Sequence, residues 1–180
     1  MKMTEEQLVK KCLEKDTLAQ KELFDYYSKR MMGVCLRYAK DAEEAQDVLQ
    51  MGFIKVFEKL DMFNAQGSLE GWIRKIIVNT SLDIIRKNKK FMNDVEMDKV
   101  DYQIHNPTEN AVDSLSAQDL LKIIQEMPPG FRTVFNMFAI EGYSHKEIAD
   151  ELNISVNTSK SQYSRARAYL QKIITEEKVL

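Results

Sequence analysis

Apolar residues recur at every third or fourth position along most of the chain, and alternating apolar and polar stretches are almost absent. This period is typical of amphipathic helices, so the sequence predicts an all-α fold. Four helices are expected in the first half, starting near Thr4, Thr17, Asp41 and Ser68. Their short connections allow these helices to bury a common core in one small domain, residues 1–90.

Helical spacing also predicts which faces point inward. In the second helix the expected core positions are Leu18, Phe24, Tyr27, Met31, Val34, Cys35 and Tyr38. The third helix has an apolar face made of Ala45, Leu49, Gly52, Val56 and Leu60. A second face of that helix comprises Asp47, Gln50, Ile54 and Glu58. The second face is expected to point away from the core.

Helical periodicity disappears between residues 91 and 115, where Asn, Asp and Pro107 dominate. The segment from Met92 to Asp119 holds seven acidic residues and one basic residue, whereas Gly71 to Lys90 holds six basic residues and one acidic residue. The net charge of −2 therefore conceals basic patches around an acidic strip. We expect residues 91–115 to be a flexible acidic linker between two domains.

Helices resume near Ser116, in a second small domain of residues 116–180. Pro128, Pro129 and Gly130 are expected to end its first helix, because proline and glycine interrupt helices. Residues 131–140 are expected to form the next helix.

A short turn then joins two further helices. Ser144 is expected to cap the first with Glu147 three residues on, Asn153 suits a left-handed turn position, and Ser155 caps the second. The second helix carries Lys160, Arg165, Arg167 and Lys172, with no acid from 158 to 172. A basic helix after a tight turn is the form that enters a DNA major groove. The alternative is a solvated basic face.

A stripe of polar and aromatic side chains follows the fourth helix at steps of three or four. Its members are Trp72, Lys75, Asn79, Asp83, Arg86 and Lys90. Cations track phosphates, aromatic rings offer a stacking plane and amides read base edges, so the stripe suits single-stranded or partly opened DNA. Two alternatives stay open: Trp72 belongs to the core, or Asp83 only pairs with Arg86 or Lys87.

Other classes of function find little support. Cys12 and Cys35 are expected to be reduced core thiols, and with two histidines they make no metal site. His105 falls in the linker and His145 is expected at the surface. We find no glycine-rich phosphate loop and no nucleophile paired with a base, so we expect no enzyme, cofactor or small-molecule substrate. The absence of a signal peptide and of a long apolar run predicts a cytoplasmic protein.

Three stretches, in order, resemble the bacterial sigma-70 superfamily, specifically its extracytoplasmic-function (ECF) type. They are DAEEAQDVLQMGFIKVF (41–57), GWIRKIIVNTSLDIIRKNKK (71–90) and MPPGFRTVFNMFAIEGYSHKEIADELNISVNTSKSQYSRARAYL (127–170). The resemblance implies a region 2-like domain at 1–90, a region 4-like helix-turn-helix domain at 116–180, and no catalysis. The implied partners are core RNA polymerase, promoter DNA and an anti-sigma factor.

The resemblance also implies roles for individual residues. Asp47, Gln50 and Ile54 would dock on the polymerase clamp. The loop Met62–Ser68, with Asn64, would capture a flipped base of the −10 element, and Trp72, Lys75, Asn79, Arg86 and Lys90 would melt and hold it. Lys160, Ser161, Gln162, Ser164 and Arg165 would read the −35 element. Gln162 stands where the family often has arginine, and Ser159 where it often has valine. The alternative is a stand-alone helix-turn-helix regulator that binds duplex DNA.

Overall fold

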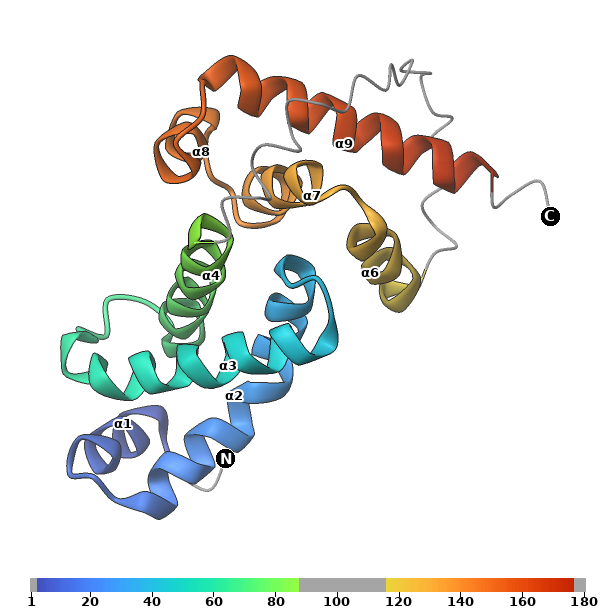
Figure 1. Cartoon of the computed structure of the whole chain (residues 1–180). Helices are drawn as coiled ribbons and strands as arrows, with labels where there is room; N and C mark the ends of the chain where they lie inside the picture. Colours follow the sequence, from blue (N-terminus) through green and yellow to red (C-terminus); the bar gives the residue numbers. More distant parts are fainter. Residues whose placement is uncertain (1–2, 88–115, 177–180) are drawn as a thin grey trace. The chain divides into compact units, whose positions relative to one another are not determined.

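The computed structural model describes residues 3–87 and 116–176, and every regular element in these ranges is helical (Figure 1). The chain divides into two compact units, Met1–Ile84 and Ile85–Leu180, called here the N-terminal and C-terminal units. The all-α prediction is confirmed. The predicted linker of residues 91–115 lies outside the described residues, as does Lys90.

The N-terminal unit contains four α-helices and one short 3-10 turn. In chain order they are α1 (Glu5–Leu13), α2 (Thr17–Tyr38), α3 (Ala42–Glu58), η1 (Leu60–Met62) and α4 (Leu69–Lys87), the last of which continues three residues past Ile84. Each α-helix begins behind a side-chain cap. Thr4 forms a capping box with Gln7, while Asp16 and Asp41 accept hydrogen bonds from the first-turn amides of α2 and α3. Ser68 Oγ accepts from the amide of Gly71 at 3.1 Å.

The cap of α2 sets which of its residues reach the core. Asp16 Oδ1 accepts from the amides of Leu18 and Ala19 at 2.9 and 3.1 Å. With the helix starting at this point, Ala19 and Leu23 lie on the same inward side as Tyr27 and Met31. Leu18 lies on the outer side and is 78% exposed. The predicted core position of Leu18 is therefore wrong, because Ala19 and not Leu18 lies on the buried face of α2.

Helix α3 has the two faces that its sequence predicts. Ala45, Leu49 and Val56 are buried, and Asp47, Gln50, Ile54 and Glu58 are exposed. Gly52 lies where α3 meets α4, and a Cβ atom placed on it would overlap Ile77 Cδ1. With Ile77 in this conformation, glycine is the residue that fits at position 52 without overlap.

Replacing Gly52 by alanine is expected to lower the free energy of unfolding by up to about 2 kcal/mol. Overpacking of a core costs about 1–3 kcal/mol, of which helix propensity returns about 1 kcal/mol. In an Ile77→Val background, which lacks the overlapping methyl, the same change is expected to be neutral or stabilising. Gly33→Ala in α2 is the matched control, since a Cβ there meets nothing within 4 Å. Equal effects of Gly52→Ala in both backgrounds, by urea unfolding, would contradict the packing argument.

The C-terminal unit contains α6 (Ala117–Glu126), α7 (Pro129–Phe135), the π-helical segment η3 (Asn136–Ile140), α8 (His145–Leu152) and α9 (Val156–Glu176). Figure 1 shows α7, α8 and α6 packed along the long helix α9. Helix α6 ends before Met127, as predicted, but Pro129 and Gly130 form the first turn of α7. Proline is favoured there because it lacks an amide hydrogen, and an amide hydrogen in the first turn of a helix would have no acceptor within the helix.

The turn between α8 and α9 follows its local sequence. Gly142 has a φ of +78° after η3, and Ser144 forms a capping box with Glu147. Asn153 adopts the predicted left-handed conformation with a φ of 55°. Ser155 Oγ accepts from the amide of Thr158 at 2.9 Å and so caps α9. The helix-turn-helix prediction is confirmed.

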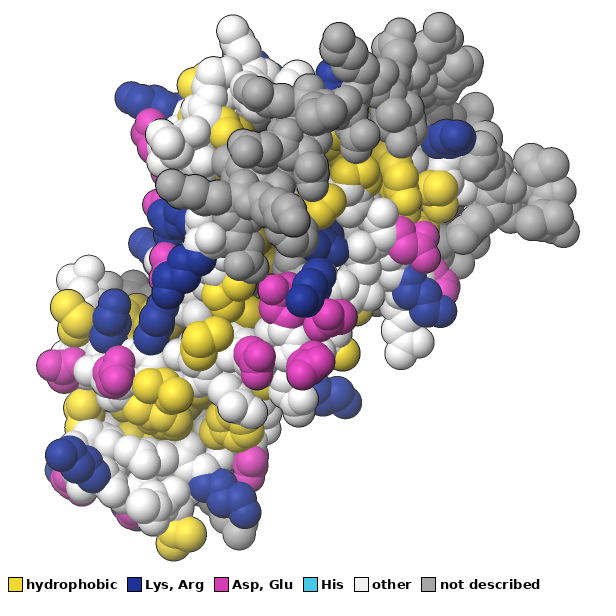
Figure 2. All heavy atoms as spheres, in the orientation of Figure 1, with side chains coloured by type: hydrophobic (Ala, Val, Ile, Leu, Met, Phe, Trp, Pro, Cys, Tyr) yellow, Lys and Arg dark blue, Asp and Glu magenta, His cyan; other side chains and the backbone are white. Residues whose placement is uncertain are grey.

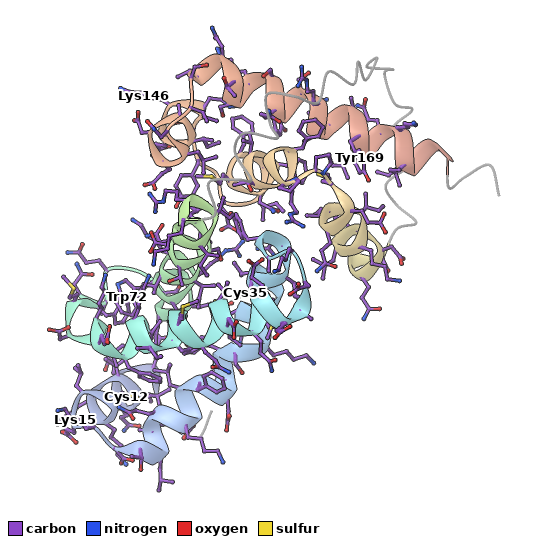
Figure 3. All side chains as sticks on the ribbon, in the orientation of Figure 1. Cys12, Lys15, Cys35, Trp72, Lys146 and Tyr169 are labelled. Atoms are coloured by element: carbon purple, nitrogen blue, oxygen red, sulfur yellow. The ribbon has the colours of Figure 1, made fainter. Side chains whose placement is uncertain are left out.

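Both cysteines are buried and unpaired (Figure 3). Burial raises the pKa of the Cys12 thiol to about 11 and that of Cys35 to about 12. No helix in the described ranges has both the length and the apolar composition required to cross a membrane.

Candidate nucleic-acid interfaces

The first turns of α9 present polar and basic side chains to solvent. Lys160 and Ser161 are exposed, and Ser164 and Arg165 are half-buried. Ser161 Oγ donates to the carbonyl oxygen of Thr158 at 2.9 Å. These four predicted residues thus lie together on one helix, and we call them the recognition face.

Gln162 does not belong to the recognition face. Its side chain is only 2% exposed, between Ser159 and Ala166, which are both fully buried. Residues three and four positions apart share a helix side, so Gln162 lies on the inward side of α9. The predicted groove-facing position of Gln162 is therefore wrong for this structure. A polar side chain at an inward position gives no signal in a hydrophobicity pattern.

An aromatic cluster supports α9 from behind. The rings of Phe138 in η3 and His145 in α8 stack at 4.2 Å, and Phe138 also contacts Tyr163 of α9 at 4.5 Å between ring centroids. His145 is half-buried in this cluster and not the surface residue that its first-turn position predicts. Three elements of the C-terminal unit are thus joined through their side chains.

Electrostatics fix the start of α8. Glu147 accepts a hydrogen bond from the backbone amide of Ser144 at 2.7 Å, and this bond is the main reason that the pKa of Glu147 is lowered. The carboxylate therefore stays ionised near neutral pH and completes the cap. Lys146, beside it, points outward into solvent (Figure 3).

The stripe on α4 is the second candidate interface. Lys75, Asn79 and Arg86 are exposed on one helix, as the spacing predicts. Trp72 is half-buried, with its ring 5.6 Å from that of Phe63, the first residue after η1 in the loop that leads to α4. Phe63 was not among the predicted site residues, and its sequence signal was an aromatic side chain within the Met62–Ser68 loop.

Two further contacts shape this surface. Asp83 accepts from Lys55 Nζ of α3 at 2.9 Å, a partner on another helix that spacing along α4 alone does not indicate. In the loop, Ala65 has a φ of 56°, and the Asn64 side chain accepts from the amide of Gln66 at 3.2 Å. Asn64 itself is exposed.

The outer face of α3 is a third exposed surface and is partly apolar. Asp47 and Gln50 are exposed beside Met51, at 41%, and Ile54, at 57%. Figure 2 shows hydrophobic side chains gathered over this part of the N-terminal unit, with acidic side chains where α3 begins. An exposed apolar group with a polar border is typical of a protein interaction site.

Comparison with known protein families matches both units in order. The model for sigma-70 region 2 matches residues 23–91, and the model for sigma-70 region 4 matches residues 117–170. The second match covers the helix-turn-helix, and the first covers α3 and the α4 stripe.

Two similar proteins are both described as ECF RNA polymerase sigma factors. The ECF RNA polymerase sigma factor SigE of Mycolicibacterium smegmatis is 28% identical over 158 residues, or 86% of this chain and 61% of that protein. The chain thus spans about three fifths of that relative. The ECF RNA polymerase sigma factor SigW of Bacillus subtilis is 28% identical over 182 residues, or 96% and 97% of the two chains.

A solved structure shares the fold. The sigma factor RpoE of Bartonella quintana, solved with the anti-sigma factor NepR, has a TM-score of 0.50 at 22% identity and covers 86% of this chain and 96% of its own. Region 2 followed by region 4, together with relatives of one name, establishes that this chain belongs to the sigma-70 family of transcription initiation factors, in its ECF group.

Proposed function

We propose that this protein directs bacterial core RNA polymerase to specific promoters, with its two units dividing the work. The C-terminal unit binds the −35 element as duplex DNA, and the N-terminal unit docks on polymerase and captures the opened −10 element. The observation that carries the proposal is the pair of exposed cationic helices, α4 and α9, each inside a matched sigma-70 region.

The α3 face of Asp47, Gln50 and Ile54 is the surface that we assign to polymerase. These side chains are exposed although the opposite face of the same helix is buried core. An apolar anchor with polar neighbours matches the usual composition of a protein interface, where a buried centre is surrounded by a polar rim.

We assign the α4 stripe and the Asn64 loop to the −10 element. Lys75 and Arg86 supply positive charge for phosphates, and Asn79 offers both a donor and an acceptor to an unpaired base. The ring of Trp72, held beside Phe63, offers a stacking plane. Lys90 belongs to the same assignment by sequence alone.

On the recognition face, Lys160 and Arg165 are assigned to phosphates and base edges, and Ser161 and Ser164 to hydrogen bonds with either. Gln162 is assigned instead to the packing of α9, because its side chain is buried.

The remaining assignments follow from the family. The protein acts without catalysis, in the cytoplasm, where bacterial polymerase works. An anti-sigma factor is its expected regulator, as one accompanies the Bartonella quintana neighbour.

Reconstituted transcription tests the proposal. The full chain is added to core polymerase on a promoter library, and we expect specific transcripts that core polymerase alone does not make. Stable, specific binding of the free chain to duplex DNA, with no stimulation of polymerase on any promoter, would instead support a stand-alone helix-turn-helix regulator.

Asn79→Ala is expected to impair promoter opening by about tenfold, in the range of one lost base contact. Asn79 is exposed, and alanine is the better helix former, so the fold of α4 is retained. Permanganate reactivity of unpaired thymines should fall while the footprint of the closed complex persists. Lys21→Ala, at an exposed position of α2, is the control. Equal loss of footprint and reactivity would contradict the assignment.

A further inference from the structure

The contact between His145 and Ser159 joins the two helices of the helix-turn-helix. His145 Nδ1 lies 2.9 Å from Ser159 Oγ, within hydrogen-bond distance. Ser159 has no exposed surface, and the next residue along α9 is Lys160 of the recognition face. Removing the hydrogen-bond partner of a polar group this deeply buried lowers the stability of the folded protein.

The imidazole is also held by rings on both neighbouring elements. It stacks on Phe138 with an interplanar angle of 13°, and it meets the Tyr163 ring edge-on at 5.9 Å. Tyr163 and Ser159 lie four positions apart on α9, so both contacts act on the same side of that helix. Together they fix the rotation of α9 about its axis relative to α8.

We propose that His145, through its hydrogen bond to Ser159, is a positioning residue that sets the angle of the recognition face and responds to pH in doing so. The inference rests on the proposed function, since it concerns how α9 reads duplex DNA. Neutral imidazole is the form that the arrangement favours.

The charges around the ring explain that preference. Burial lowers the pKa of His145 below its ordinary value, and Lys160 on α9 lowers it further. Segment η3 contributes no titratable group, α9 adds the phenol of Tyr163 beside Lys160, and on α8 Glu147 is held by Ser144 while Lys146 is exposed. Because the pKa of His145 is lowered, the contacts of its ring with Ser159 and Phe138 are fully stable at a pH above the ordinary pKa of histidine. They weaken as the pH falls below that value and the ring becomes protonated.

The test uses holoenzyme made from core polymerase and the full chain. The measured quantity is the ratio of affinities for a promoter and for the same promoter with a scrambled upstream element, from about pH 7.5 to about pH 5.5. His145→Phe keeps the ring and removes the hydrogen bond, and Ser159→Ala removes its partner. His145→Asn places a hydrogen-bonding group near the former Nδ1. His105→Phe is the control for the only other histidine of the chain.

We expect each single variant, His145→Phe or Ser159→Ala, to lower the ratio about two- to tenfold, the range of one hydrogen bond, and the double variant to lower it no further. His145→Asn should restore part of the ratio. The wild type and His105→Phe should lose discrimination in acid, whereas His145→Phe should show a flat pH profile.

Additive losses in the double variant would overturn the inference, as would the same pH profile in His145→Phe and wild type. Thermal unfolding of each variant separates misfolding from misplacement of α9, and if His145→Phe fails to fold, Ser159→Ala and His145→Asn carry the test. Wild-type holoenzyme without any upstream preference would refute the proposed function itself. A wild-type preference that every variant retains would refute this inference alone.

Discussion

Ile54→Glu is expected to remove most of the affinity of the protein for core polymerase and to leave the N-terminal unit folded. Ile54 is 57% exposed, so its apolar surface contributes little to the core. In an interface, a central apolar anchor is worth about 2 kcal/mol or more, roughly 30-fold in affinity, and a buried unpaired carboxylate adds a further cost.

The matched control for Ile54→Glu is Leu18→Glu. Leu18 is a more exposed apolar residue of the same unit, at 78%, on α2 and outside the assigned face. Binding of fluorescently labelled protein to core polymerase measures the effect. Equal losses of affinity from the two variants would remove the basis for assigning α3 to polymerase.

Lys160→Glu is expected to weaken promoter binding by the holoenzyme and to leave polymerase binding intact. The exposed ammonium sits on the recognition face, and its replacement by a carboxylate introduces repulsion with DNA phosphates. The expected loss is about 1–3 kcal/mol, roughly fivefold to 150-fold in affinity.

Salt dependence identifies the kind of contact that Lys160 makes. If it contacts a phosphate, Lys160→Ala lowers the slope of log affinity against log salt by about one and acts on all sequences alike. Lys122→Glu, exposed on α6 of the same unit, is the control with the same charge change. If Lys160→Glu also abolishes polymerase binding, the division of work between the units is refuted.

Local rules explain the parts of the fold that were predicted correctly. The helix starts near Thr4 and Asp41, the cap at Ser144 and the left-handed Asn153 depend on residues within one turn of each other. The two faces of α3 follow from spacing alone. Such features need no knowledge of which helices pack together.

The wrong predictions depend on tertiary packing. Leu18 is apolar yet exposed and Gln162 is polar yet buried, because the packing partners of α2 and α9 decide which side is covered. The cluster around His145 depends on η3, whose π-helical geometry no sequence period indicated. For the candidate site, sequence located the helices and most exposed residues, whereas Phe63 and the Lys55–Asp83 pair required the folded structure.

The two buried cysteines bear on how this protein receives signals. Oxidants such as hydrogen peroxide react with the thiolate and not with the thiol, and the raised pKa values of Cys12 and Cys35 keep both sulfurs protonated. Their burial also denies small reagents access. Oxidation of these two thiols is therefore not the expected route by which an oxidant would act on this protein.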